Sequence, residues 1–168
     1  MNIQQLFDVL STIPGRNVQL TQDQENIVRH SGGPGWVLAG PGSGKTEVLT
    51  ISLLRLLYVS DDPIQAQPFS PESIFITTFT EKAARNLEDR LAFYRHHIIQ
   101  AHPNLGDIDI SKLRIGTLHG LCNDLLQEFR YPGYQNVRLM DSFEQAIFIH
   151  QHMSICLLYT SPSPRDRG

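Results

Sequence analysis

The sequence has very little cysteine: only Cys122 and Cys156 occur among its 168 residues. Cys156 falls in a terminal stretch that we do not expect to belong to the domain, which leaves Cys122 alone. A lone cysteine can form neither an internal disulfide nor a metal cluster. Inside an apolar helical pattern it is more often a small core residue than a nucleophile. This usage fits a reducing compartment.

Long hydrophobic runs are also missing. No apolar run approaches the roughly 20 residues of a membrane-spanning helix, and the run at residues 53–57 is interrupted by Arg55. Residues 1–10 lack the basic beginning of a secretory signal peptide. We therefore expect no membrane association and a cytoplasmic location.

An excess of positive charge is absent as well. The chain has 14 Lys and Arg against 17 Asp and Glu, which gives a net charge of −3. This mild acidity argues against a protein that coats nucleic acid by charge alone. It does not argue against a protein that holds single strands by stacking on their bases.

What the sequence does contain is a glycine-rich stretch between two apolar segments. It reads Ala39-Gly40-Pro41-Gly42-Ser43-Gly44-Lys45-Thr46 and has the form of a P-loop. The apolar residues 35–38 before it predict a strand, and the periodic residues 47–59 after it predict a helix. Backbone N–H groups of such a loop, at a helix N-terminus, form a concave site for phosphates.

The chemistry of this loop assigns roles to its last two residues. Lys45 is expected to reach the β- and γ-phosphates of a bound nucleotide, and the Thr46 hydroxyl to ligate Mg²⁺. All eight residues, 39–46, are predicted to bind the nucleotide. The alternative is a chance Gly/Ser turn between a strand and a helix, and the intact residues 42–46 with both flanks in place argue against it.

Alternating strand and helix patterns predict an α/β fold with a parallel sheet flanked by helices. Strand, helix and strand around the P-loop imply a right-handed βαβ unit. The predicted helices cover residues 3–13, 21–30, 47–59, 81–100, 119–129 and 143–152, and further extended segments cover residues 73–78, 113–116 and 137–140. Thr21, and Thr78 or Thr80, are candidate N-caps.

The last residues resemble something other than a natural domain. Residues 156–166 look like a transposase sequencing adapter translated in one frame. The alternative is a natural Ser/Pro-rich tail, and the agreement at each of the eleven residues argues against it. Such scars are excluded from fold reasoning. We therefore expect one domain over residues 1–155, with residues 156–168 as an adapter-derived tail and the natural protein continuing past about Ile155.

Four motifs follow one another along the chain. They are Leu20-Thr21 with Gln24, the P-loop at 39–46, Thr78-Phe79-Thr80-Glu81-Lys82-Ala83-Ala84, and Gly116-Thr117-Leu118-His119-Gly120-Leu121. In this order they resemble the N-terminal part of a UvrD/Rep-like superfamily 1 DNA helicase. The resemblance takes in nearly all of residues 17–152 and implies an incomplete RecA-like P-loop NTPase fold.

The resemblance implies roles for five residues outside the P-loop. Gln24 becomes the adenine reader, because a side-chain amide donates and accepts at once; without the resemblance it is a solvated helix residue. Phe79 becomes a stacking surface for DNA bases. Without the resemblance, a core position for Phe79 would be an equally good prediction. The resemblance implies that Thr80, Thr117 and His119 hydrogen-bond the backbone of the single strand. Without it, His119 would be read as a histidine at a helix start with no functional role.

The chain departs from the family pattern at three positions. Leu118 stands where a phenylalanine is common, which removes an aromatic contribution to strand binding. Glu81 stands where an asparagine is common and places a carboxylate near an expected polyanion. Glu47 stands where many relatives have a basic residue near the nucleotide.

The residues that stabilise the transferred phosphoryl group are missing. No Asp-Glu pair follows an apolar strand in residues 47–155, and there is no Gly-Asp-x-x-Gln segment. The family's later arginine, which stabilises charge on the transferred phosphoryl group, is also missing. We expect this piece to bind ATP without hydrolysing it. The whole protein is implied to be an ATP-driven 3′-to-5′ single-stranded DNA translocase or helicase. The alternatives are a P-loop kinase or other non-helicase P-loop NTPase, and an interaction module with a vestigial P-loop.

Overall fold

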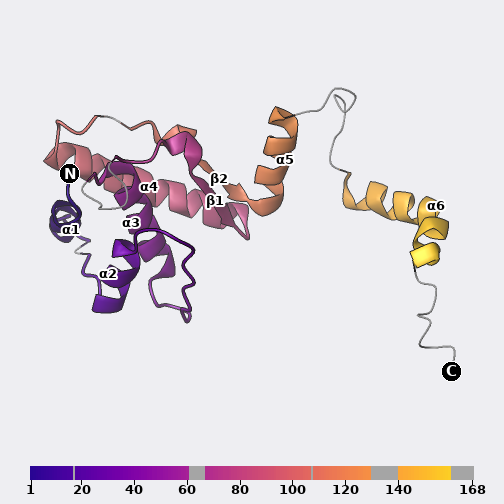
Figure 1. The fold of residues 1–168 in the computed structure, drawn as a ribbon, viewed down its shortest axis with the longest axis horizontal. Helices are drawn as coiled ribbons and strands as arrows, with labels where there is room; N and C mark the ends of the chain where they lie inside the picture. The colour runs from indigo at the N-terminus through magenta and orange to yellow at the C-terminus, as the bar shows by residue number, and fades with distance from the viewer. Residues whose placement is uncertain (17, 61–66, 107, 130–139, 160–168) are drawn as a thin grey trace. The chain divides into compact units, whose positions relative to one another are not determined.

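The computed structural model describes residues 1–16, 18–60, 67–106, 108–129 and 140–159, and for residues 153–159 it describes the helical backbone alone. The chain divides into two compact units, residues 1–122 and 123–168, which are taken separately. Figure 1 shows the ribbon. The expected extended segment at 137–140 falls almost entirely outside the described residues.

The predicted helices are all present, whereas strands occur only on either side of the helix Glu81–Ala101 in the described residues. The helices are α1 (Ile3–Ser11), α2 (Gln22–Arg29), α3 (Lys45–Tyr58), α4 (Glu81–Ala101), α5 (Leu118–Glu128) and α6 (Ser142–Tyr159), the strands are β1 (Phe75–Thr78) and β2 (Arg114–Thr117), and two 3₁₀ turns cover Pro71–Ser73 and Ile110–Lys112. The last helix continues past its predicted end at residue 152 to Tyr159.

Local capping sets several helix beginnings. Thr21 and Gln24 form a capping box at α2, and the Thr80 hydroxyl accepts a hydrogen bond from the Ala83 backbone N–H at α4. The cap at Thr21 was predicted from the sequence, and of the two candidates for α4, Thr78 and Thr80, the structure has Thr80. In the second unit, the Asp141 carboxylate accepts from the Glu144 backbone N–H at 2.8 Å, at the start of α6. Such side-chain acceptors satisfy N–H groups that have no partner within the helix.

The sheet of the first unit is parallel, as expected. Strands β1 and β2 pair in parallel, from Phe75 opposite Arg114 to Thr78 opposite Thr117. Helix α4 connects the two strands and packs against both of them. The described part of the chain therefore holds a βαβ unit whose sheet has two strands.

The prediction of a strand before the P-loop is wrong. Residues 36–38 form no strand, and the side chains of Trp36 and Leu38 are 88% and 87% exposed. A strand depends on a neighbour for its backbone hydrogen bonds, and β-propensity depends strongly on that context. No described segment pairs with residues 36–38, so their apolar sequence alone does not make them a strand.

The core of the first unit positions the P-loop helix. Helix α3 packs against both α2 and α4, and α1 packs against α4. The fully buried side chains of this core come chiefly from α1, α3 and α4. They include Leu6, Leu10, Ile51, Leu54, Leu57, Leu87, Leu91 and Tyr94. Because α3 is buried along much of its length, its N-terminal end is held firmly beside the glycine-rich loop.

Two further observations concern the sequence-based expectations. The prediction that Cys122 is a small core residue is wrong, since Cys122 is exposed on α5. None of the helices in the described part of the chain is long and apolar enough to cross a membrane.

The exposed apolar segment at residues 36–38 predicts self-association of the 168-residue chain. Contiguous exposed apolar residues favour contact with other chains. We expect the double variant Trp36→Ser, Leu38→Ser to scatter less light and to sediment more nearly as a monomer than the unchanged chain. Leu126→Ser is the matched control, because it removes a 64%-exposed leucine outside this segment. Monomeric behaviour of the unchanged chain would contradict the prediction.

Candidate functional site

The glycine-rich loop turns through two left-handed residues into α3. Gly42 has a φ of +75° and Gly44, the N-cap of α3, has a φ of +78°. Glycine adopts this conformation without the strain that a Cβ atom causes. The Ser43 hydroxyl donates to the Gly40 carbonyl at 2.8 Å and braces the turn. The loop thus leads into a helix N-terminus, whose first N–H groups lack intrahelical partners and attract anions.

The Lys45 ammonium folds back over the loop. Its Nζ donates to the carbonyl oxygens of Gly40 and Ala39, at 2.6 and 3.2 Å. Hydrogen bonds from an ammonium to a charged phosphate oxygen are stronger than those to a neutral carbonyl. Lys45 therefore lies where a phosphate seated in the loop could take it from these two carbonyls.

A cavity of about 760 Å³ opens beside the loop, within the size range of small-molecule sites. Its lining includes most of the predicted nucleotide residues, namely Gln24, Ala39, Gly40, Gly42, Ser43, Gly44 and Lys45. Pro41 and Thr46 lie outside that lining. Thr46 is the second residue of α3 and is exposed.

The apolar wall of this cavity was missed in the sequence analysis. Ile27, Val48 and Leu49 contribute to it from α2 and α3. The spacing offers a signal, because these residues stand three or four positions after Gln24 and Lys45, on the same helix faces. An apolar wall beside a phosphate cradle suits the base or sugar of a nucleotide.

Gln24 uses both ends of its amide in this structure. Its Oε1 accepts from the Thr21 backbone N–H at 2.9 Å, and its Nε2 donates to the Ser43 carbonyl at 3.1 Å. The side chain therefore joins the start of α2 to the P-loop. To read an adenine edge, Gln24 would have to exchange one of these partners for the base, so its role as adenine reader stays a prediction.

Gly44 is the position of the loop least able to accept a side chain. An added Cβ would lie 3.0 Å from the Gln24 Nε2, and the positive φ adds strain of about 1–2 kcal/mol. We expect Gly44→Ala to push the loop out of shape and lower nucleotide affinity roughly ten-fold, as read by titration with a fluorescent ATP analogue. Gly15→Ala is the matched control, since Gly15 has a φ of +74° with nothing within 4 Å. Equal affinities for the two variants would contradict this account of the loop.

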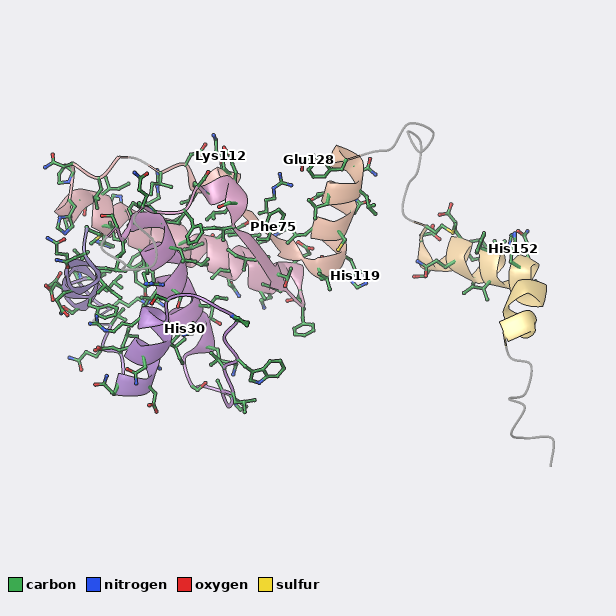
Figure 2. The ribbon with its side chains drawn as sticks, in the orientation of Figure 1. His30, Phe75, Lys112, His119, Glu128 and His152 are labelled. Carbon is green, nitrogen blue, oxygen red and sulfur yellow. The ribbon has the colours of Figure 1, made fainter. Side chains whose placement is uncertain are left out.

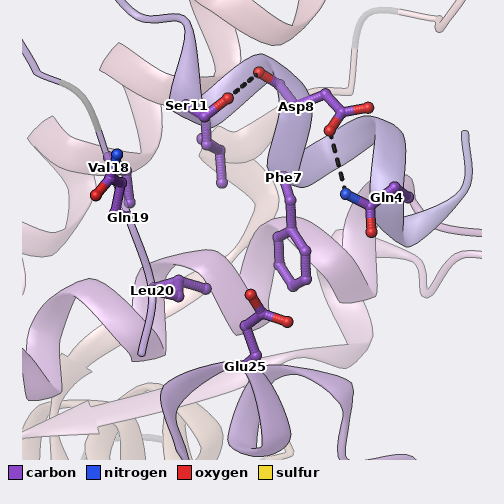
Figure 3. Close-up of a pocket in the computed structure, with 9 residues that line it drawn as sticks. Gln4, Phe7, Asp8, Ser11, Val18, Gln19, Leu20 and Glu25 are labelled. Carbon is purple, nitrogen blue, oxygen red and sulfur yellow. Dashed lines mark hydrogen bonds between the residues drawn. The ribbon is translucent and has the colours of Figure 1, made fainter. Parts of the chain in front are cut away.

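A second cavity, of about 340 Å³, lies between α1, residues 18–20 and α2. Figure 3 shows the carboxylates of Asp8 and Glu25 at its wall, with Asp8 held by the Gln4 amide at 3.1 Å. Carboxylates repel phosphate groups at this range. The larger cavity also has one carboxylate in its lining, Asp23, but it contains the glycine-rich loop, which this cavity lacks.

The predicted strand-binding residues come together at one edge of the sheet. Thr78 and Thr117 are paired at the ends of the parallel strands β1 and β2, so the segments that follow them, 79–80 and 118–119, start side by side. Phe79 is fully exposed, which excludes the alternative that it belongs to the core. His119 is exposed at the start of α5, as Figure 2 shows. Ligands of open α/β sheets bind at this carboxyl edge.

The two threonines at this edge act as caps. The Thr80 hydroxyl accepts from the Ala83 N–H at 3.2 Å, and the Thr117 hydroxyl accepts from the Gly120 N–H at 3.2 Å. Each hydroxyl can still donate its own hydrogen to a phosphate oxygen. The neighbouring Leu118 is 59% exposed, so an aliphatic side chain faces solvent beside Phe79's edge of the sheet.

The described residues include no group of three or more His, Cys, Asp or Glu side chains that could hold a metal ion. Mg²⁺ often keeps several waters and binds proteins through few ligands together with substrate phosphates. The exposed Thr46 hydroxyl, next to the loop, is a single oxygen ligand that fits that mode of binding.

Comparison with known proteins gives one family and several relatives. The model of the UvrD/REP helicase N-terminal domain matches residues 20–160. The chain is 39% identical over 93 residues to ATP-dependent DNA helicase SRS2 of Saccharomyces cerevisiae, covering 55% of this chain and 7% of that protein. It is 32% identical over 111 residues to ATP-dependent DNA helicase Rep of Buchnera aphidicola, covering 66% of this chain and 14% of that protein. It is 30% identical over 109 residues to DNA helicase II of Rickettsia typhi, covering 65% and 14%.

Proposed function

Because the chain belongs to the UvrD/REP helicase N-terminal domain family, we propose that it forms the ATP-binding part of an ATP-dependent, single-stranded DNA translocase or helicase. The relatives named above are several times longer than the part of them that this chain matches. Activity, substrate and direction of movement are therefore proposals for the whole protein. The direction, 3′ to 5′, comes from the family resemblance.

The observation that carries the proposal is the geometry of the loop at residues 39–46. Its left-handed glycines lead into the N-terminus of α3, and Lys45 lies over the loop carbonyls. We infer that the loop N–H groups and Lys45 bind the β- and γ-phosphates of ATP, while Thr46 ligates Mg²⁺. Bound ATP and Mg²⁺ supply the phosphoryl group and the neutralising charge that such hydrolysis needs.

The second part of the site is the sheet edge that carries Phe79 and His119. We propose that the exposed Phe79 ring stacks on a DNA base, which is a sequence-tolerant contact. Thr80, Thr117 and His119 would hydrogen-bond the strand's backbone. Both parts belong to the first compact unit, residues 1–122, so one unit would hold nucleotide and strand together.

Residues 1–155 are proposed to bind ATP without turning it over. The loop provides contacts to ground-state phosphates, and residues 47–155 contain no Asp-Glu pair after an apolar strand. Hydrolysis requires groups that orient the attacking water and stabilise the transferred phosphoryl group. In the whole protein, ATP would bind between two RecA-like domains, and hydrolysis would open and close the cleft while strand contacts exchange bases.

Titration of the whole protein with a single-stranded oligonucleotide, with and without a non-hydrolysable ATP analogue, tests the proposal. We expect binding of the strand and a change of its affinity when the analogue is present. A P-loop kinase, or an interaction module with a vestigial P-loop, would show no such binding. Absence of strand binding under both conditions would contradict the proposal.

A further inference from the structure

Glu47 is a first-turn residue of α3 that the nucleotide cavity does not include. It follows Thr46 directly and is the third residue of the helix, yet it is not part of the cavity lining. Its carboxylate is only 19% exposed. A carboxylate so close to a phosphate cradle would repel the nucleotide unless other groups neutralised it.

Three donors converge on this carboxylate. The Arg16 Nη2 donates to Oε2 at 2.9 Å, the Arg90 Nη1 donates to the same oxygen, and the Tyr94 hydroxyl donates to Oε1. The Arg16 guanidinium also lies over the Tyr94 ring, 5.2 Å from its centroid. The cluster of Arg16, Glu47, Arg90 and Tyr94 thus neutralises the carboxylate and fixes its orientation.

Two members of the cluster belong to α4, the helix that leads back to the strand-binding edge. Arg90 and Tyr94 are one helical turn apart, and Tyr94 is fully buried. The same helix begins at Glu81, is capped by Thr80 and follows Phe79 directly. At 1.5 Å per residue, Arg90 lies about 14 Å along the helix from its first residue. One rigid helix therefore spans from the Glu47 cluster to the turn that carries Phe79.

At the P-loop end of this connection, Lys45 has partners that a bound phosphate would replace. Lys45 donates to the carbonyls of Ala39 and Gly40 in this structure, whereas binding of a phosphate would take it from them. Such an exchange of partners would act on the first turn of α3, because Lys45 and Glu47 both belong to that turn. Coupling between two sites needs a contiguous element whose arrangement both ligands influence. The contacts of Glu47 with Arg90 and Tyr94 make the first turn of α3 and helix α4 contiguous between the two sites.

We infer that Glu47, through Arg90 and Tyr94, is the positioning residue that couples the nucleotide site to the strand-binding turn at Phe79 and Thr80. The inference rests on the proposed function of both sites. Coupling is reciprocal, so nucleotide changes strand affinity by the same factor as strand changes nucleotide affinity. Loss of the Glu47 clamp should remove that factor while leaving each ligand able to bind alone.

The test is the ratio of strand affinities with and without a non-hydrolysable ATP analogue, measured in the whole protein with a fluorescent oligothymidylate. In the unchanged protein we expect a ratio of at least about five-fold. Glu47→Gln keeps the size of the side chain and removes its charge, and Tyr94→Phe removes one hydroxyl and keeps the buried ring. We expect both variants to bring the ratio close to one. Glu72→Gln is the matched control, because it breaks the exposed Lys112 ion pair, 2.7 Å long, at the 3₁₀ turns.

The outcomes separate the coupling from the proposed function. A protein that binds no ATP analogue contradicts the proposed function itself. A protein that binds both ligands without any linkage, or variants that keep the full ratio, overturn the coupling alone. A purely structural role would lower the urea midpoint of Glu47→Gln and leave the ratio unchanged, and that result also overturns the inference. If Glu47→Gln does not fold, the ratio of Tyr94→Phe decides.

Discussion

Replacement of Lys45 by alanine is expected to abolish ATP turnover by the whole protein. Lys45 is the cation that lies over the loop carbonyls, with its Nζ 2.6 Å from the Gly40 carbonyl oxygen. In phosphoryl transfer, charge spreads over the phosphate oxygens, and the P-loop lysine stabilises it. Removal of one such preorganised donor typically costs a factor of about 100–1,000 in rate.

Steady-state release of inorganic phosphate, at saturating ATP and single-stranded DNA, measures the effect of Lys45→Ala. Lys112→Ala is the control, since Lys112 is paired with Glu72 at the surface and lies outside the loop. Its turnover should match that of the unchanged protein. If ATP turnover persists in Lys45→Ala, the proposal that the loop at residues 39–46 is the phosphate site is contradicted.

Replacement of Phe79 by alanine is expected to weaken single-strand binding by about 1–3 kcal/mol, the range found for base stacking on aromatic side chains. Phe79 is fully exposed at the carboxyl edge of the sheet and contributes nothing to the core. The loss should depend little on base sequence, because every base offers a π-face. The free energy of unfolding should change little, because the Phe79 side chain is exposed in the folded chain.

Fluorescence anisotropy with oligothymidylate and oligoadenylate measures this loss for Phe79→Ala. Phe79→Tyr keeps the ring and should keep most of the affinity. Phe69→Ala is a further control, because Phe69 is 44% exposed and precedes the first 3₁₀ turn. An unchanged affinity of Phe79→Ala would mean that another residue provides the stacking surface.

The parts of the fold that depend on neighbouring residues were predictable from the sequence. The caps at Thr21 and Thr80 are formed by side chains and N–H groups three residues apart, so the chain order contains all the information needed. The parallel pairing of β1 and β2 joins distant segments and is an exception: it was predictable because two apolar segments are separated by one long helix. The spacing of glycines likewise predicted the loop that Lys45 covers.

The parts that depend on distant segments were not predictable in the same way. Residues 36–38 have the composition of a strand, yet a strand also needs a partner, and the described residues provide none. Cys122 has apolar neighbours in sequence but stands on the exposed face of α5. The partners of Glu47 lie 31, 43 and 47 positions away from it, so no local pattern indicates that its carboxylate faces two arginines.

The central claim, that the P-loop of this chain serves a DNA-dependent ATPase, is tested most directly by the rate of ATP hydrolysis of the whole protein with and without a single-stranded oligonucleotide. The account predicts a rate that rises when the strand is added and a rise that is lost in both Lys45→Ala and Phe79→Ala. A rate of hydrolysis that is the same with and without the strand would contradict it.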